Sequence, residues 1–120
     1  MEPKIDDSRM GSITIDGVTY DHDVVIRRGG KVKKRKKKLS KEIYGTSHLI
    51  SREEAEHIYD EGAERLVIGS GQHGNLRLSE AAEEVFRKRR VKVEVHPTPT
   101  AIQRWNELEG AVIALFHVTD

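Results

Sequence analysis

The feature that most constrains this chain is a change of hydrophobic pattern near residue 50. Beyond it, short apolar stretches alternate with amphipathic segments of about ten residues, which is the spacing of strands and helices. Strands joined by single helices pair in parallel through right-handed crossovers. The pattern therefore predicts a parallel β-α-β-α-β unit. The predicted strands lie near residues 66–69, 91–95 and 111–118, and the predicted helices near 52–61, 80–90 and 100–109.

Polar side chains mark where these helices are expected to begin. Ser51 and Glu54 have the spacing of a capping box, and Ser79 precedes the second helix. For the third helix, either Thr98 or Thr100 is expected to provide the cap.

Before residue 50 the pattern is that of antiparallel hairpins. Ser12–Ile15 alternates polar and apolar residues and leads into Asp16-Gly17, a strong two-residue turn signal. Val24–Ile26 is β-branched, and Gly29-Gly30 supplies the positive φ that a second tight turn needs. We therefore expect one compact α/β domain over residues 1–120. Its mixed sheet would combine the parallel C-terminal unit with an antiparallel N-terminal hairpin addition.

Composition limits both the chemistry and the compartment. Apolar residues make up 36% of the chain and charged residues 34%, enough for one modest core under a charged surface. The absence of cysteine excludes disulfides, thiolate metal sites and a cysteine nucleophile. The longest apolar run, Ala111–Phe116, is far shorter than the roughly 20 residues of a membrane span, and the N-terminal segment lacks a secretory signal. The expected class is a small soluble domain of the cytoplasm with no membrane partner.

Positive charge is concentrated in one segment, residues 31–41, which we call the basic run. It holds eight bases and no acid, so the other thirteen bases face all twenty acids and the rest of the chain carries −7. Bases attract phosphate backbones, which makes the run a candidate for weak nucleic-acid binding. It has no aromatic side chains for stacking on bases, which favours a solvated, mobile connector instead. The residues considered for nucleic acid are Lys33, Lys34, Arg35, Lys36, Lys37 and Lys38.

A glycine-rich turn, residues 69–74, directly follows a predicted strand and matches the pattern G-x-G-x-x-G. In dinucleotide-binding proteins such glycines let pyrophosphate approach the N–H groups of a helix N-terminus. Here the next helix is expected to begin only near Ser79, and Glu94, the nearest acid for a ribose, lies within a strand rather than at its tip. The pattern therefore favours a turn that needs positive φ, and it leaves a small-anion site open.

The histidines and serines form no recognised metal-binding or catalytic motif. None of the six histidines has a partner at helical i, i+4 spacing, so no metal and no cofactor is expected. Ser47 and Ser70 lie near histidines in sequence, but neither lies in a nucleophile elbow, so no catalytic residue is assigned. Three histidines fall at or just beyond the C-terminal ends of predicted parallel strands, the edge where α/β sheets bind ligands. They are His73, His96 and His117.

Several segments, in a fixed order along nearly the whole chain, carry a family resemblance. They are the hairpins with Gly11 and Gly29-Gly30, the loop 45–48, the strand and turn 66–71, the helix bearing Trp105-Asn106 and the ending 116–119. Together they resemble the Mth domain family, which includes the adipogenesis-associated Mth domain-containing protein, and most of all its small archaeal members. The resemblance implies an α/β fold with a mixed central sheet and no established catalytic residues. Relatives often have cysteine where this chain has Asp120, so thiol chemistry is not open to it.

One pocket is predicted at the C-terminal edge of the parallel strands. Gly69 and His117 both fall there, glycine turns expose N–H donors, and the resemblance favours histidine at positions 48 and 117. The alternative is structural, with His48 bonding a strand-end carbonyl and pinning the connector to the sheet. The predicted pocket, for a small anion such as phosphate or a carboxylate, comprises Gly45, Thr46, Ser47, His48, Gly69, Ser70, Gly71 and His117.

Three function classes follow, in order of preference. The first is a non-enzymatic binding or assembly module whose partner is a protein or a small anion. The second is a small-anion or metabolite-binding enzyme that uses the crevice at the C-terminal edge of the parallel strands. The third is weak nucleic-acid binding through the basic run, which the acidic body disfavours. The chain is expected to be a monomer or a homodimer.

Overall fold

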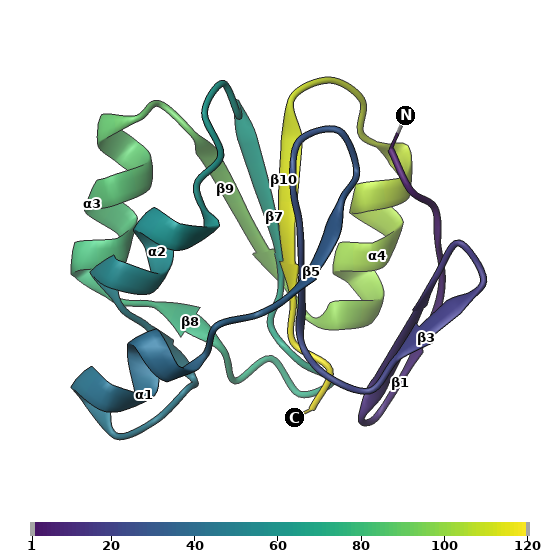
Figure 1. Cartoon of the computed structure of the whole chain (residues 1–120), viewed down its shortest axis with the longest axis horizontal. Helices are drawn as coiled ribbons and strands as arrows, with labels where there is room; N and C mark the ends of the chain where they lie inside the picture. Colours follow the sequence, from purple (N-terminus) through teal and green to yellow (C-terminus); the bar gives the residue numbers. More distant parts are fainter. Residues whose placement is uncertain (1, 120) are drawn as a thin grey trace.

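A five-stranded mixed sheet forms the centre of the computed structural model, which describes residues 2–119 (Figure 1). The strands lie in the order β5, β4, β10, β7, β9. Because β10 is the middle strand, it joins the early and late parts of the chain. The bounds are β4 Val24–Ile26, β5 Val32–Lys34, β7 Arg65–Gly69, β9 Lys92–His96 and β10 Val112–Phe116.

The predicted β-α-β-α-β unit is confirmed. β7 pairs in parallel with β9 on one side and with β10 on the other, so that Ile68 lies opposite both Val95 and Leu115. The crossover helices are α3 (Glu80–Lys88) and α4 (Thr98–Glu107). They cover opposite faces of the sheet (Figure 1), because the β7–α3–β9 crossover runs outward, the β9–α4–β10 crossover runs back across β7, and both are right-handed.

Alternate residues of the central strands contribute to two apolar cores. Leu66 and Ile68 of β7 pack in one core with Phe86 of α3 and with α2 (Arg52–Ile58). Val67 packs in the other core with Trp105 of α4. All five residues of β10 are buried, as expected for a strand covered on both faces.

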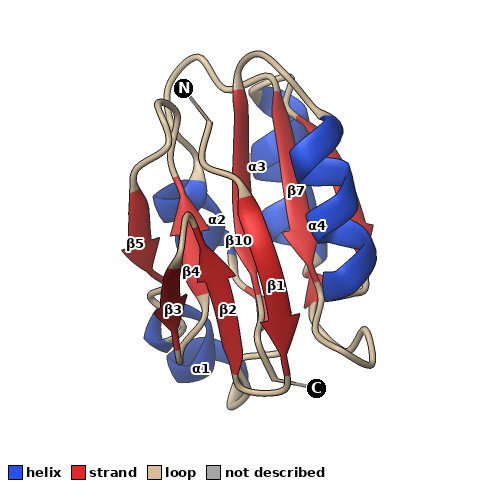
Figure 2. Cartoon of the chain, turned by 90° about the vertical axis from the view of Figure 1, so that its right-hand side faces the viewer, coloured by secondary structure: helices blue, strands red, loops and turns tan. Residues whose placement is uncertain are grey.

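The N-terminal residues form a separate three-stranded antiparallel sheet beside α4 (Figure 2). The predicted turn at Asp16-Gly17 is confirmed, and its φ angles of 48° and 80° are the left-handed values that a two-residue hairpin turn requires. The second predicted hairpin, around Gly29-Gly30, consists of β4 and β5 and joins the central sheet antiparallel to β10. The bounds of the separate sheet are β1 Ile5–Arg9, β2 Ser12–Ile15 and β3 Val18–Tyr20.

Short elements also occur where the sequence pattern predicts none. Helix α1 (Lys38–Tyr44) begins inside the basic run and ends at Gly45, whose φ of 73° is left-handed. β6 (Leu49–Ile50) and β8 (Arg77–Leu78) form a small parallel ladder. The expectation that the basic run is a mobile connector is therefore wrong, because β5 and α1 include most of it.

The helices begin at the predicted caps in two of three cases. Ser51 and Ser79 each accept a hydrogen bond from the N–H three residues on, at 3.0 and 3.1 Å. At α4 the prediction is wrong, because Pro97 is in the cap position and no side chain caps the helix. Thr98 is buried instead, and its hydroxyl donates to the carbonyl of His117 at 2.8 Å. The start of α4 is thereby joined to the end of β10.

Candidate functional site

Arg35, in the middle of the basic run, is buried and paired. Its side chain is only 1% exposed, and it donates to both carboxylate oxygens of Glu54, at 2.6 and 3.0 Å. It also donates to Asp23 Oδ2 at 2.8 Å and to the carbonyl of Ser47 at 2.6 Å. Burial by itself lowers the pKa of Arg35, but the two carboxylates outweigh it and raise the pKa. The guanidinium therefore stays charged, and its planar fork holds three chain segments together.

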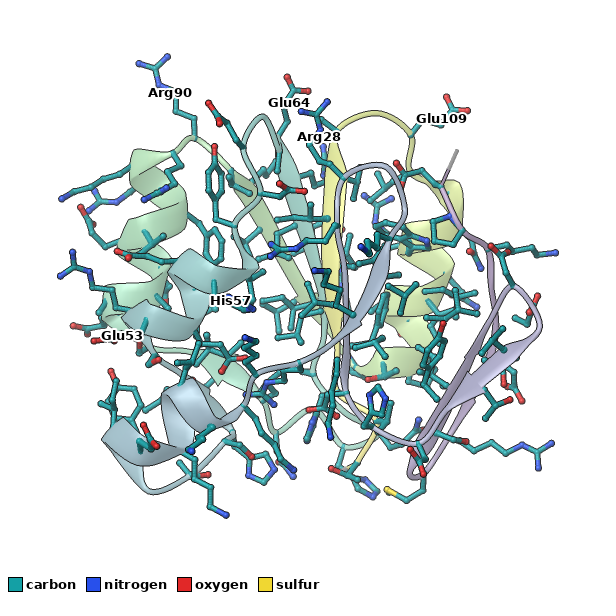
Figure 3. The ribbon with its side chains drawn as sticks, in the orientation of Figure 1. Arg28, Glu53, His57, Glu64, Arg90 and Glu109 are labelled. Atoms are coloured by element: carbon teal, nitrogen blue, oxygen red, sulfur yellow. The ribbon has the colours of Figure 1, made fainter. Side chains whose placement is uncertain are left out.

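Glu54 is the buried counter-ion of Arg35. It is fully buried, whereas its neighbour Glu53 points outward into solvent (Figure 3). The hydroxyl of Ser40, on α1, donates to the Glu54 carboxylate, and the N–H of Ser51 donates to Ser40 Oγ at 2.8 Å. The predicted capping box is thus only half formed. Ser51 caps α2, but the Glu54 carboxylate binds Arg35 and Ser40 instead of completing the box.

Asp23 connects this ion cluster to the end of β10. Its Oδ2 lies 2.7 Å from His117 Nδ1, and its Oδ1 accepts a hydrogen bond from the N–H of Val118 at 2.9 Å. Burial raises the pKa of Asp23, but the contacts with His117, Val118 and Arg35 outweigh it and lower the pKa to about 2. The carboxylate therefore fixes the orientation of the His117 ring. The other ring nitrogen, Nε2, lies 3.2 Å from Thr119 Oγ1.

A hollow of about 220 Å³ adjoins the cluster. The rings of His48 and His117 meet there edge to face, with their centroids 5.3 Å apart. The walls come from residues 21–23, from the basic run and from the ends of the α1–β6 loop and β10. This polar lining, with three cations against two carboxylates, suits a small polar ligand rather than an apolar one. The lining comprises Asp21, His22, Asp23, Lys34, Arg35, Lys37, Ser47, His48, His117 and Thr119.

Three of the eight residues of the predicted pocket meet at this hollow, namely Ser47, His48 and His117. The two histidines lie on the same side of the sheet, as a shared pocket requires. Gly45 and Thr46 directly precede them but do not line the hollow. Gly45 ends α1, and Thr46 Oγ1 accepts a hydrogen bond from the N–H of His48 at 3.1 Å. Ligand binding at this hollow stays a prediction.

The turn Gly69-Ser70-Gly71 does not line the hollow. The N–H and the hydroxyl of Ser70 both donate to the carbonyl of His96, at 2.8 and 3.0 Å, and the N–H of Gly71 donates to Thr98 Oγ1 at 2.9 Å. The expectation that these groups face a ligand is therefore wrong. A Cβ on Gly69 would come within 2.7 Å of the Phe116 ring, so glycine at this position permits the close packing of β7 and β10.

Two central members of the site, Asp23 and Arg35, were not predicted from the sequence as pocket residues. A signal existed, because Arg35 is the single arginine among seven lysines in the basic run. The expectation that the whole run is solvated is wrong at this position, although the lysines around it are exposed. Arg35 is too buried to contact a nucleic acid. Nucleic-acid binding by Lys33, Lys34, Lys36, Lys37 and Lys38 stays a prediction.

A second arginine–carboxylate cluster lies at the far edge of the sheet. Glu94 of β9 accepts two hydrogen bonds from Arg104, both 2.8 Å long, and it also binds Arg65 and lies 3.1 Å from His96 Nε2. The contact with Arg104, only partly opposed by burial, holds the pKa of Glu94 well below its usual range. Glu94 is thus committed to this cluster, which removes the nearest candidate acid for a ribose.

These features define a class of small α/β domain, in which a parallel unit is extended by antiparallel strands and a buried arginine ties the two parts together. The profile of a family described as "Protein of unknown function (DUF498/DUF598)" matches residues 5–117, and the chain belongs to this family. The predicted Mth domain relationship is confirmed, because similar solved structures include MT938 and a Mth938-like domain.

Three solved structures illustrate the relationship. The conserved hypothetical protein PH1505 from Pyrococcus horikoshii is 35% identical with a TM-score of 0.92, and the match covers 98% of this chain and 99% of that one. MT938 is 36% identical with a TM-score of 0.84, covering 99% and 100%. A Mth938-like domain from Bordetella pertussis shares the fold, at 16% identity and a TM-score of 0.69, covering 97% and 85%. Among curated proteins, none matches the chain. No helix within residues 2–119 has the length and apolar character to cross a membrane.

Proposed function

We propose that this protein is a non-enzymatic binding module, and that the hollow between His48 and His117 takes a small anion such as phosphate or a carboxylate. The observation that carries the proposal is the convergence of these two rings with Lys34 and Lys37 on one hollow. An action in the cytoplasm, as a monomer or homodimer, stays part of the same proposal.

The charges around the hollow support an anion as the ligand. Arg35 is held by Glu54 and Asp23, so it shapes the floor while its charge is largely balanced. Lys34 and Lys37 are exposed and add two positive charges at the rim, against one negative charge from the exposed Asp21. Imidazole adds a hydrogen-bond donor and gains positive charge when protonated. The site therefore has a base whose charges are paired within the protein and cationic side chains at its mouth.

A titration with inorganic phosphate tests the proposal, with acetate as the carboxylate probe and potassium chloride at matched ionic strength as the reference. Phosphate or acetate should raise the melting temperature of the wild type by mass action on the folded state. His48→Ala and Lys37→Gln should reduce that rise. Lys38→Gln, which changes an exposed lysine outside the hollow, should not. Equal shifts in all four proteins, or none beyond the chloride reference, would overturn the proposal.

One observation favours a second candidate, an acyl-transferring enzyme at the same hollow. Asp23, His117 and Thr119 form a hydrogen-bonded chain in which a carboxylate orients an imidazole beside a hydroxyl. In such an enzyme Thr119 Oγ1 would attack an ester carbonyl, and His117 would pass the hydroxyl proton to the leaving alcohol. Water would then release the acyl group from Thr119.

The ester p-nitrophenyl acetate tests this second candidate. The wild type should release p-nitrophenolate, and mass spectrometry should find acetyl on Thr119. Thr119→Val should abolish both signals without changing the melting temperature, because Thr119 is exposed. Release of p-nitrophenolate that is unchanged in Thr119→Val would exclude the candidate.

A further inference from the structure

The outer edge of β9 has backbone groups that no neighbouring strand occupies. β9 is the last strand in the order of the five-stranded sheet within residues 2–119. The N–H of Lys92 donates to Glu64 at 2.9 Å and the carbonyl of His96 accepts from Ser70 at 2.8 Å, so both residues direct these groups towards the β7 side. In a parallel ladder the direction alternates from residue to residue. The N–H and C=O groups of Val93 and Val95 therefore point to the open edge.

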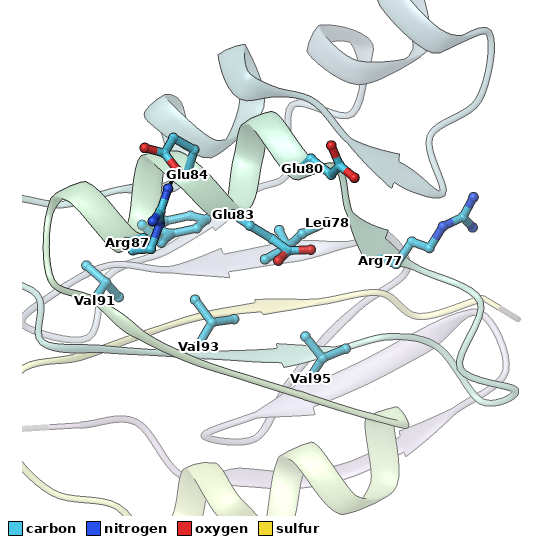
Figure 4. Close-up of a pocket in the computed structure, with 10 residues that line it drawn as sticks. Arg77, Leu78, Glu80, Glu83, Glu84, Arg87, Val91, Val93 and Val95 are labelled. Carbon is cyan, nitrogen blue, oxygen red and sulfur yellow. Dashed lines mark ion pairs between the residues drawn. The ribbon is translucent and has the colours of Figure 1, made fainter.

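The side chains of the same valines line an open groove. The groove, of about 800 Å³, lies between β9 and α3 (Figure 4), with Leu78 and Phe86 also in its lining. α3 covers Val91 and leaves Val95 45% exposed. Both the side chain and the backbone of the outer half of β9 thus remain accessible. An exposed apolar strand edge of this kind is a template for pairing with another extended segment.

The opposite wall of the groove is charged, with three glutamates between two arginines. Glu80 and Glu83 of α3 belong to this lining; Glu83 extends over the groove and Glu80 lies at the start of the helix (Figure 4), and neither makes an ion pair within the described part of the chain. Glu84, one residue further, is already paired with Arg87 and Lys88. Two carboxylates without an ion pair in the described part of the chain therefore line a groove whose other side is an open, valine-rich strand edge.

We propose that this groove binds an extended basic peptide segment of a partner protein, which adds to the sheet beside β9. The peptide backbone would bond Val93 and Val95. Lysine or arginine at alternate positions would lay the aliphatic stem along the valines and place its charge at Glu80 and Glu83.

A second copy of this chain fits the groove less well than a basic peptide. The charged lining runs from Arg77 through Glu80 and Glu83 to Arg87, with the acids in the middle. If two copies paired through β9 around a two-fold axis, the middle of one copy's charged wall would face the middle of the other's. Glu80 and Glu83 of one copy would then repel the same residues of the second copy. The charge pattern thus selects a basic partner over symmetric self-association.

The probe is the synthetic peptide acetyl-KTKTKTK-amide, titrated into the ¹⁵N-labelled full chain and followed by NMR. The amides of Val93, Val95 and α3 should shift, and Glu80→Lys with Glu83→Lys should weaken binding by at least about tenfold. The same double variant should gain affinity for acetyl-ETETETE-amide. Glu53→Lys, which reverses an exposed charge on α2, is the matched control and should bind like the wild type.

Two further measurements make the proposal refutable. Two KTKTKTK peptides, N-methylated at the odd or at the even residues, each lose half of their N–H donors. Only one of these halves faces β9 in an added strand, so one of the two peptides should fail to bind. Absence of binding, equal binding of the basic and acidic peptides, or shifts confined to another surface would overturn the proposal. A dimer in sedimentation would also overturn the proposal, if Glu80→Lys with Glu83→Lys dissociates that dimer and the peptide does not bind the wild type.

Discussion

Two arginine–carboxylate clusters stabilise this domain, and they differ chiefly in exposure. In the first, the Arg35 and Glu54 side chains are 1% and 0% exposed, whereas in the second, Arg104 and Glu94 are 36% and 14% exposed. Both pairs have the same two-pronged geometry. The clusters differ in the surroundings of the charge that is left unpaired when one partner is removed. In the first cluster a charge would be left without water, and in the second it would be largely hydrated.

The largest effect is expected from Arg35→Met, which tests the buried cluster directly. We expect it to lower the free energy of unfolding by about 3–5 kcal/mol, because Glu54 is left buried without a counter-charge. Urea denaturation followed by circular dichroism measures the change. Adding Glu54→Leu to this variant should recover part of the loss, since Asp23 is then the one carboxylate left from this cluster and it keeps its contacts with His117 and Val118. A loss below about 1 kcal/mol would show that burial does not distinguish the two clusters.

A smaller effect is expected from acid, through Asp23 in the same buried cluster. Its pKa in the folded protein is about 2, below the ordinary 3.8, so the charged carboxylate stabilises the fold above that ordinary value. This contribution, about 2 kcal/mol, should be lost as the pH falls through 3.8 towards 2. Urea denaturation at a series of pH values measures it. Asp23→Asn should lose correspondingly less stability over that interval, and parallel curves for the two proteins would contradict the assignment.

The second, partly exposed cluster is expected to give a smaller change than the loss of Arg35. Glu94→Gln should lower the free energy of unfolding by about 1–2 kcal/mol, less than Arg35→Met, because the partly exposed Arg104 is hydrated when its partner is neutral. One molar sodium chloride should shrink the difference between the variant and the wild type, since salt screens exposed pairs. A loss as large as that of Arg35→Met would remove the contrast between the clusters.

The smallest change is expected in the basic run around Arg35. Replacing Lys36 by Gln should alter the free energy of unfolding by less than about 0.5 kcal/mol, because the side chain is exposed. Differential scanning calorimetry of this variant beside Arg35→Gln measures two neighbouring bases under the same conditions. Similar melting temperatures for the two variants would mean that Arg35 contributes no more to stability than its exposed neighbour Lys36.

The sequence predicted the parts of the fold that local periodicity controls. The β-α-β-α-β unit and the Asp16-Gly17 hairpin followed from patterns only a few residues long. The ion cluster did not, because its partners are distant in sequence: Arg35 meets Glu54 over 19 residues, and Asp23 meets His117 over 94. Glu54 shows the reason most clearly. Its spacing from Ser51 predicts a helix cap, and only the folded chain reveals a stronger partner for its carboxylate.

The candidate pocket was predicted in part for the same reason. His117 was expected at the C-terminal end of a parallel strand, and His48 lies beside it because the connector returns to that edge. The glycine turn at residues 69–71 shares the strand-end position, but the N–H groups of Ser70 and Gly71 are taken up by His96 and Thr98. Strand topology thus determined the edge of the sheet, and hydrogen bonds between distant segments decided which residues line a hollow there.

The position of β10 has a consequence for the order in which the chain is made. The strand that lies between β4 and β7 is also the last element along the described chain. During synthesis, β4 and β7 leave the ribosome long before the strand that joins them, and Asp23 leaves it long before its partner His117. Until β10 emerges, the early hairpin and the later β7–β9 pair have no common sheet and expose apolar faces. The domain can therefore complete its fold only after synthesis has passed Phe116, and the nascent chain carries two unfinished half-sheets until then.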